Sequence, residues 1–395
     1  PDAPHAGVGE SLVRRLAEHF KARGAAYMDL SVMHDNEQAI ALYEKLGFHR
    51  VPFFSVKRKN PINEPLFTGQ GPEAALNPYA KIITDEARRR GIAVEVIDAD
   101  SGLFALTYGG RTVRCRESLS EFTSAVAMSI CDDKRLTRRV AETAGVAVPA
   151  QLTEDSAEAR ARFRAEHGAV VVKPARGEQG RGISVGLTDD AEVEEAVAAA
   201  REVCANVILE SFFEGEDLRL IVIDYRVVAA AVRRPAHVIG DGRNSVRALI
   251  EAQSRRRASA TGGESGIPLD AETERCVAAA GYGMETVPPQ GAEFPVRRTA
   301  NLHTGGTIHD VTGETHPALI DAAIAAAHAI EIPVTGIDLM VKSPRLPEHV
   351  FIEANERPGL ANHEPQPTAE RFVDLLFPFS IPNALRGMQA QTRTP

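Results

Sequence analysis

Apolar runs and alternating patterns divide the chain into strands and helices. The apolar run 169–172 is typical of a buried strand. Lys173 follows it, and Pro174 must end the strand. Glycines follow, and residues 183–185 form a second short strand. The same criteria predict further strands over residues 92–97, 104–107, 112–116, 206–210, 226–232, 335–341 and 350–354.

Helical spacing of apolar residues predicts helices over residues 79–90, 134–144, 189–201 and 317–330. Gly109-Gly110 and Asp224-Tyr225 are placed to turn hairpins. Residues 254–267 contain three successive arginines and then small polar residues, which predicts a solvated, mobile loop. Strands interspersed with helices predict a protein of the α/β and α+β classes.

The N-terminal segment has its own pattern. Gly7-Val8-Gly9 precedes an amphipathic helix that Gly24 ends, and alternation over 26–32 predicts a strand. A second helix begins near Asn36 and ends at Gly47, and a further strand is expected over 48–57. Residues 58–78 are rich in Pro, Gly and Asn and are expected to be a linker.

Composition narrows the functional classes. The net charge is −9 without a sustained basic run, so no nucleic-acid partner is expected. No apolar stretch reaches about 18 residues, so no membrane span is predicted. The four cysteines lack C-x-x-C spacing, which favours reduced thiols and a cytoplasmic location. The chain begins at Pro1 within a motif, so we expect sequence upstream of it.

The glycine-rich stretch after Lys173 predicts a phosphate-binding loop. Gly177, Gly180 and Gly182 let the backbone approach a polyphosphate, and Lys173 and Arg181 add positive charge. The alternative is an ordinary β-hairpin with a solvated lysine. The stretch is neither a Walker A loop nor a dinucleotide fingerprint, because the required spacing and the long following helix are missing.

Two acidic residues stand in apolar strands. Asp338 lies in G-I-D-L-M-V and Glu353 in V-F-I-E-A-N, and burying such carboxylates is costly unless they are paired or bind a metal. With the side-chain oxygen of Asn355 they form a hard-oxygen set that suits Mg²⁺ bound to phosphate rather than zinc. A pair of structural salt bridges is the alternative. Lys134, taken alone, favours interpretation as a surface charge.

The segment D-N-x-x-A-I-x-L-Y-E-K-L-G-F, after a G-x-G helix and a strand, resembles the C-terminal half of GNAT acetyltransferases. The resemblance implies that Gly7 and Gly9 bind the coenzyme A pyrophosphate, Asn36 contacts the cofactor and Tyr43 protonates the thiolate. A simple turn and a core tyrosine are the alternatives. Because the acceptor-binding half of that domain is absent, we expect acetyl-CoA chemistry only in a longer protein.

Five motifs in residues 132–380 together resemble ATP-grasp ligases of the cyanophycin synthetase and glutathione synthetase-like branches. They are D-K-x-x-T, V-V-V-K-P-x-x-G-x-x-G-R-G-I-S-V, E-G-E-D-x-R, T-A-N-L-x-T-G-G and I-E-A-N-x-x-P-G-L. The resemblance implies an ATP-grasp fold, two α+β subdomains gripping ATP. The expected divisions are a partial GNAT domain (1–57), the linker (58–78), a pre-ATP-grasp α/β unit (79–131), the ATP-grasp domain (132–385, lid about 146–213) and a tail (386–395).

This resemblance also implies roles for individual residues. Lys134 and Lys173 would bind ATP phosphates beneath a flexible loop over 177–183. Glu210, Ser211 and Phe213 would hold adenine, and Asp217 the ribose. Asp338, Glu353 and Asn355 would bind two Mg²⁺ ions, with Mn²⁺ as a substitute, while Arg219 and Arg298 would act catalytically on the γ-phosphate and the substrate carboxylate.

The fusion of a GNAT segment to such a ligase resembles the N-acetylglutaminylglutamine synthetase family. That resemblance implies a cytoplasmic ligase that joins N-acetylglutamine and glutamine through an acyl phosphate, to make an osmoprotective solute. It also implies a functional link to an asparagine synthetase-like amidotransferase, and is compatible with a homo-oligomer. The alternatives are a cyanophycin- or glutathione-synthetase-like ligase for other amino acids, and an acetyltransferase with a regulatory ATP-binding module.

Overall fold

The computed structural model describes residues 7–22, 28, 30, 32, 36–49, 75–177, 181–260, 265–298, 300 and 302–380. The chain forms two compact units, Pro1–Glu64 and Pro65–Pro395, and each is considered by itself. In the described part of the chain, no helix is both long and apolar enough to cross a membrane.

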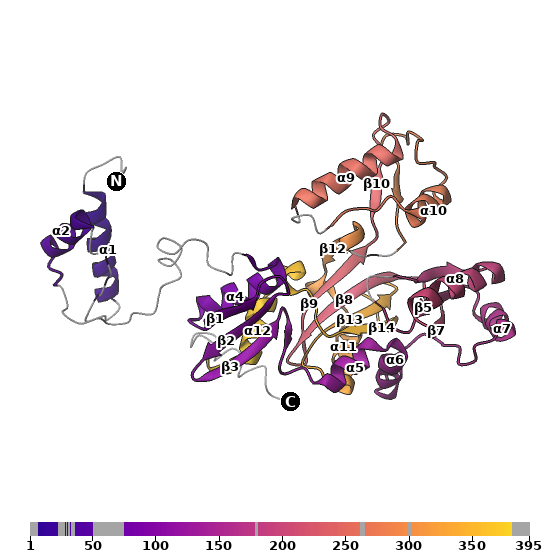
Figure 1. Ribbon diagram of the computed structural model, residues 1–395, viewed down its shortest axis with the longest axis horizontal. Coiled ribbons are helices and arrows are strands. Elements are labelled where there is room, and N and C mark those ends of the chain that lie inside the picture. The colour runs from indigo at the N-terminus through magenta and orange to yellow at the C-terminus, as the bar shows by residue number, and fades with distance from the viewer. Residues whose placement is uncertain are drawn as a thin grey trace. The chain divides into compact units, whose positions relative to one another are not determined.

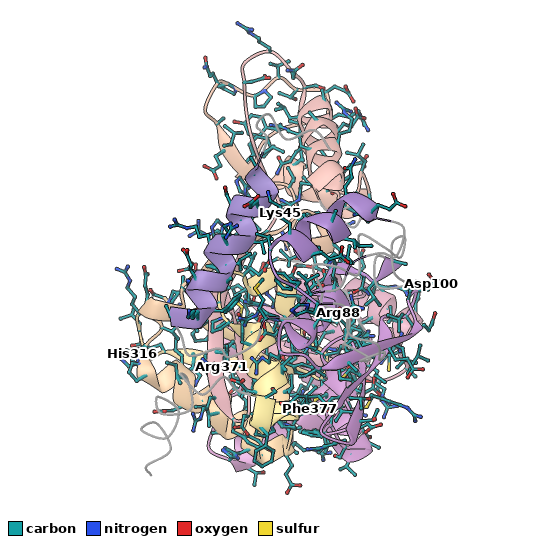
Figure 2. The ribbon with its side chains drawn as sticks, turned by 90° about the vertical axis from the view of Figure 1, so that its left-hand side faces the viewer. Lys45, Arg88, Asp100, His316, Arg371 and Phe377 are labelled. Atoms are coloured by element: carbon teal, nitrogen blue, oxygen red, sulfur yellow. The ribbon has the colours of Figure 1, made fainter. Side chains whose placement is uncertain are left out.

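The first unit contains two described helices, α1 (Val8–Ala22) and α2 (Glu37–Lys45). Asn36 caps α2, and the Lys45 ammonium, labelled in Figure 2, lies 2.8 Å from the Glu10 carboxylate of α1. The strands predicted over 26–32 and 48–57 fall almost entirely outside the described residues. So does most of the predicted linker.

The second unit begins with a small antiparallel sheet in the order β1-β2-β3-β4. Its strands are β1 (Ala93–Asp98), β2 (Leu103–Tyr108), β3 (Arg111–Arg116) and β4 (Leu119–Ser120). Helices α4 (Pro78–Arg89) and α12 (Thr368–Leu376) share one apolar core with this sheet. Buried Arg90 joins the two helices, since its guanidinium lies 2.5 Å from both Glu86 and Asp374.

A five-stranded antiparallel sheet forms the centre of this unit, in the order β12-β9-β8-β13-β14 (Figure 1). Its strands are β8 (Glu216–Ile223), β9 (Arg226–Arg234), β12 (Thr307–Asp310), β13 (Val334–Val341) and β14 (His349–Asn355). Helices α5 (Ala125–Asp132), α6 (Lys134–Thr143) and α11 (Pro317–Ile330) cover one face with an apolar core. The predicted strands and the predicted helix over 317–330 are confirmed.

A three-stranded antiparallel sheet, β6-β5-β7, stands beside the central sheet. It consists of β5 (Val170–Pro174), β6 (Ser184–Leu187) and β7 (Val207–Ser211). Helices α7 (Ala157–His167) and α8 (Asp190–Val203) pack on it around a separate core. We call this part, residues 150–211, the lid.

A further small layer follows β9. Strands β10 (His237–Ile239) and β11 (Glu293–Pro295) pair, and helices α9 (Val246–Ala260) and α10 (Ala271–Ala279) pack on them. The predicted loop over 254–267 is therefore wrong for residues 254–260, which continue α9. The Arg257 side chain stabilises this helix end by donating a hydrogen bond to Ser265 Oγ, 3.1 Å away. Short 3-10 turns cover Leu302–Thr304, Thr312–Glu314, Leu360–His363 and Pro378–Ser380.

Candidate active site

Charged side chains gather on the face of the central sheet opposite α11. Strand alternation sends Leu218, Leu220 and Ile337 into the core, so Asp217, Arg219 and Asp338 project from the other face. The pairing of the strands sets Asp338 opposite Arg219 on one side and opposite Glu353 on the other. Directly opposed residues lie about 5 Å apart at Cβ, so the two carboxylates are neighbours.

Asp338 is the centre of a buried ionic network. Both of its oxygens lie 2.6 Å from the Arg219 guanidinium, and Arg233 reaches one of them at 2.9 Å. Burial disfavours the ionised form, but Arg219 and Arg233 outweigh it and hold the pKa of Asp338 below its usual range. Arg233 also binds Asp217 at 2.7 Å. Burial raises the pKa of Asp217 to about 6 although Arg233 opposes the rise.

The three proposed metal ligands lie near one another, Asp338 in the middle of β13 and Glu353 and Asn355 among the last residues of the neighbouring β14. Asn355 donates a long hydrogen bond of 3.5 Å from its Nδ2 to Asp338, and Glu353 contacts Lys134 loosely, at 3.5 Å. These hard oxygen donors fit Mg²⁺. Among the described residues, no group of three or more His, Cys, Asp or Glu side chains is arranged to hold an ion. A bound ion would therefore need phosphate oxygens or water to complete its coordination.

Of the two candidate lysines, Lys173 lies on β5 of the lid and Lys134 begins α6. Lys173 and Glu210 form a buried ion pair of 2.6 Å, and Gln151 donates a hydrogen bond to Glu210. Lys134 donates to the Gly177 carbonyl at 3.0 Å, and so joins the glycine-rich loop to Glu353.

Gly177 and Gly182 of this loop have φ values of +137° and +71°, which favour glycine. Arg181 is exposed, and Gly180 lies outside the described residues.

The end of β7 and the connection from the lid to β8 carry the residues expected to hold adenine. Ser211 Oγ accepts a hydrogen bond from the Ala150 amide, and Lys342 lies 5.2 Å from the centre of the Phe213 ring. Gly215 has no room for a side chain, because a Cβ there would lie 2.3 Å from the Val341 carbonyl oxygen. The connection therefore packs tightly against β13.

Arg298, the second arginine expected to act catalytically, contacts the lid. Its guanidinium donates to the Val185 carbonyl of β6, at 2.9 Å. The guanidinium that joins Arg219 on Asp338 belongs to Arg233, which the sequence analysis did not select. Its position in the sequence was an available signal, because Arg233 is a charged residue that directly follows the apolar run 227–232 within β9.

Sequence reasoning also missed three half-buried or buried residues on this side. Met340 and Ile352 are half-buried, whereas their neighbours Leu339 and Phe351 point into the core, so they offer an apolar surface beside Asp338 and Glu353. His363 is buried, and its Nδ1 has no hydrogen-bond partner among the described residues. Burial, together with Arg219 and Arg233, lowers the pKa of His363 to about 4.

The four coenzyme A candidates all lie in the first unit. Gly7, with φ of +90°, immediately precedes α1, and Gly9 lies in its first turn against Leu42. The Asn36 side chain accepts a hydrogen bond from the Ala39 amide at 3.1 Å, and therefore caps α2. Tyr43 packs edge-on against Phe48, with ring centres 5.7 Å apart.

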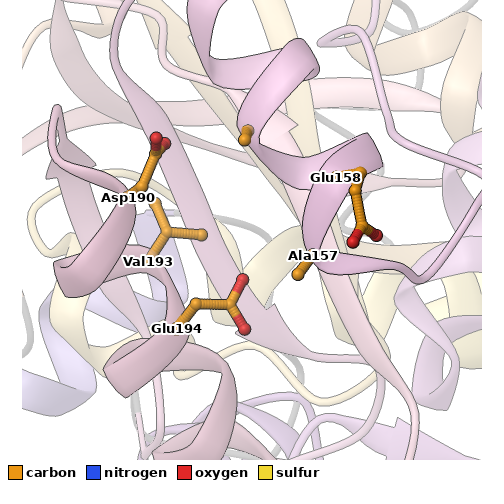
Figure 3. Close-up of a pocket in the computed structure, with 6 residues that line it drawn as sticks. Ala157, Glu158, Asp190, Val193 and Glu194 are labelled. Atoms are coloured by element: carbon orange, nitrogen blue, oxygen red, sulfur yellow. The ribbon is translucent and has the colours of Figure 1, made fainter.

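A cavity of about 310 Å³ lies outside the charged cluster, between α7 and α8 of the lid (Figure 3). Glu158, Asp190 and Glu194 line it. Asp190 and Glu194 already pair with arginines, Arg164 and Arg160. Two of the three carboxylates that line the cavity are therefore already paired with arginines of the lid.

Comparisons with known proteins agree with this layout. Residues 1–48 match the Acetyltransferase (GNAT) family model. Cyanophycin synthetase of Trichormus variabilis is 33% identical over 322 residues, covering 78% of this chain and 36% of the relative. The glutathione biosynthesis bifunctional protein GshAB of Desulfotalea psychrophila is 28% identical over 274 residues, covering 67% of this chain and 35% of the relative.

A crystal structure of a bifunctional glutathione synthetase from Pasteurella multocida is similar in fold. Its TM-score is 0.56 at 24% identity, with 77% of this chain and 43% of that chain covered. The predicted ATP-grasp fold is confirmed, and it is preceded by a segment with GNAT similarity. The chain spans little more than a third of the curated relatives named above.

Proposed function

We propose that this chain is an ATP-dependent carboxylate–amine ligase that joins N-acetylglutamine to glutamine through an acyl phosphate. One observation carries the proposal. Lys134 and the Arg219–Arg233 pair converge with the oxygen donors of Asp338, Glu353 and Asn355 on one face of the central sheet. Such an array suits a triphosphate and its metal, because both demand dense and fixed charge.

In this proposal each group has a separate task. Lys134 and Lys173 bind phosphate oxygens, and Glu210 with Phe213 lies beside the base, which Met340 and Ile352 support from the sheet. Asp338, Glu353 and Asn355 would hold Mg²⁺, which neutralises phosphate charge when bound. The guanidiniums of Arg219 and Arg233 stabilise the charge that develops on the transferred phosphoryl group.

The chemistry has two steps. A carboxylate oxygen attacks the γ-phosphorus, and the bond to the bridging oxygen breaks to release ADP. The amine then attacks the acyl carbon, loses a proton, and phosphate departs with the acyl–oxygen bond pair. An acyl phosphate hydrolyses in water, so the lid must close over it between the steps.

The choice of substrates is supported by the order of the parts. A segment with GNAT similarity, residues 1–48, precedes the ligase unit in the chain, and an N-acetylated amino acid is a product that an acetyltransferase could supply to the ligase. Relatives named for cyanophycin and glutathione synthesis are consistent with ligation of amino acids or small peptides.

A phosphate-release screen of acid and amine pairs with Mg²⁺ and ATP tests the proposal, with product masses measured. We expect release with N-acetylglutamine and glutamine together, and a product lighter than the two by one water. Release with other amino acids only would contradict the substrates. No release with any pair would contradict the ligase function.

A further inference from the structure

Arg357 stands just beyond the metal-ligand candidates and takes no part in the network around Asp338. It follows Asn355 by two residues, in the segment that leaves β14. The next residue, Pro358, lies against Gly336, where a Cβ would be 3.2 Å from Pro358 and 3.6 Å from the Arg219 side chain. Arg357 therefore emerges beside the site that Arg219 and Asp338 occupy.

Among the described residues, the guanidinium of Arg357 has an ion-pair partner at its Nε. Its Nε lies 3.6 Å from the Glu117 carboxylate. Neither of its two terminal nitrogens has a hydrogen-bond partner among the described residues, and the side chain is 32% exposed. An arginine supported at Nε still offers its forked end, which matches the two oxygens of a carboxylate.

Glu117 has an unusual backbone conformation, and its carboxylate has a second partner besides Arg357. It is the first residue of the two-residue turn between β3 and β4, with φ of +53°, where glycine or asparagine is ordinarily favoured. Its other carboxylate oxygen accepts a hydrogen bond of 2.9 Å from the Asn77 amide. Asn77 is fixed in turn, because its side-chain oxygen caps α4 by accepting from the Ala80 amide.

The neighbouring residues hold this turn to the segment of Arg357. Ser118 Oγ donates a buried hydrogen bond of 2.6 Å to the Pro358 carbonyl, and Gly359 packs directly against Tyr79. The small first sheet thus sets the direction of the Arg357 side chain. A strained residue that is supported so fully is characteristic of a functional position.

We propose that Arg357, positioned by Glu117, binds the carboxylate of the amine substrate, the one that is not activated. This inference rests on the proposed ligase function. The amine substrate of a peptide-forming ligase is itself an amino acid, and its carboxylate must be kept from the γ-phosphate. A guanidinium beside the site, with its fork free, holds that carboxylate apart and turns the amine toward the acyl carbon.

A comparison of L-glutamine with its α-carboxamide as amine substrate tests this assignment on the full chain. Wild type should prefer the acid over the amide, measured by kcat/KM. Arg357→Ala should raise the KM for glutamine about 10- to 100-fold, the loss expected for a charge-assisted paired contact, and should abolish the preference. The KM for ATP should stay unchanged, which separates a substrate carboxylate from a phosphate.

Two further variants control the experiment. Glu117→Gln should reduce the acid-over-amide preference only in part, because it removes support rather than the receptor. Arg345→Ala, which removes an exposed arginine paired with Glu314, should leave the preference unchanged.

Two outcomes would overturn the assignment. They are an unchanged preference in Arg357→Ala, and, should that variant fold poorly, an unchanged preference in the uncharged variant Arg357→Gln. A wild-type chain without ligase turnover would instead contradict the proposed function.

Discussion

At the scale of single residues, the two lysines proposed to bind ATP differ in their surroundings. Lys173 is buried in an ion pair with Glu210, whereas Lys134 reaches Glu353 and a loop carbonyl across looser contacts. A lysine can thus serve the fold and a ligand at once. For Lys173, the expected contact with ATP phosphates therefore comes in addition to a structural ion pair.

Lys173→Met and Lys134→Ala should both weaken nucleotide binding, but only Lys173→Met should also destabilise the chain. Removing Lys173 leaves Glu210 buried without its partner, which costs about 3–5 kcal/mol. Calorimetric titration with ATP and urea denaturation measure the two effects. Lys81→Ala, which removes an exposed pair with Asp85, is the control. Equal stability of the two site variants would contradict this account.

His363 should make stability depend on pH. Unfolded histidine gains a proton below about pH 6.5, but the folded chain keeps His363 neutral until about pH 4, so stability is lost as the pH falls through this window. Asp217, with its raised pKa of about 6, acts in the opposite sense.

His363→Gln should therefore remove about 2 kcal/mol of the change in unfolding free energy between pH 7 and pH 5. Urea denaturation at both pH values measures it, because Asp217 is present in both chains and only the histidine differs. Identical pH dependence in variant and wild type would rule out a neutral buried His363.

At the scale of elements, the site depends on how the lid joins the central sheet. The connection after β7 passes so close to β13 that Gly215 has no space for a Cβ, and the Phe213 ring crowds the same point. Gly215 therefore lets the lid connection pack closely against β13, the strand that carries Asp338. Changes at this junction act on the site without touching any charged group.

Gly215→Ala should lower stability by about 1–3 kcal/mol and weaken ATP binding, because the new methyl group forces the connection away from Val341. Gly313→Ala is the matched control, since a Cβ there meets nothing within 4 Å and its backbone is not in the left-handed region. Thermal unfolding with and without ATP measures both effects. Similar behaviour of the two variants would contradict the junction's role.

At the scale of the whole molecule, a metal–nucleotide complex would join parts that otherwise have separate cores. The lid, the central sheet and the layer of α9 and α10 each pack around their own apolar residues. Lys134 is one of the side chains that bridge these parts, because it contacts both the lid loop and β14. A ligand held by several of these parts should therefore stabilise the whole unit.

Mg²⁺ with ATP should raise the melting temperature by several degrees, and chelation of Mg²⁺ should remove most of this gain. Glu353→Gln should lose the Mg²⁺-dependent part while folding normally, because Glu353 is partly exposed and contacts Lys134 at only 3.5 Å. Differential scanning calorimetry with and without Mg²⁺ measures it. A full Mg²⁺ response in Glu353→Gln would remove this residue from the proposed metal set.

The sequence by itself determined the elements and the chemistry that each one carries. Local patterns are sufficient for strands such as β13 and β14, because alternation and a lone carboxylate in an apolar run are properties of neighbouring residues. Motifs in a fixed order likewise predicted the ATP-grasp fold, which the solved structure of a glutathione synthetase supports. The loop predicted over residues 254–260 was wrong, and there Arg257 of α9 donates a hydrogen bond to the carbonyl of Gly306, 49 positions further along the chain, which local patterns cannot reveal.

Only the tertiary structure decided which groups meet. Strand register sets Arg219 and Glu353 on either side of Asp338, and it brings in Arg233 while Arg298 turns to the lid. The support of Arg357 by Glu117 joins residues that lie 240 positions apart in the chain. Sequence cannot supply such pairings, because the ion pairs depend on side chains that folding alone brings within a few ångströms of each other.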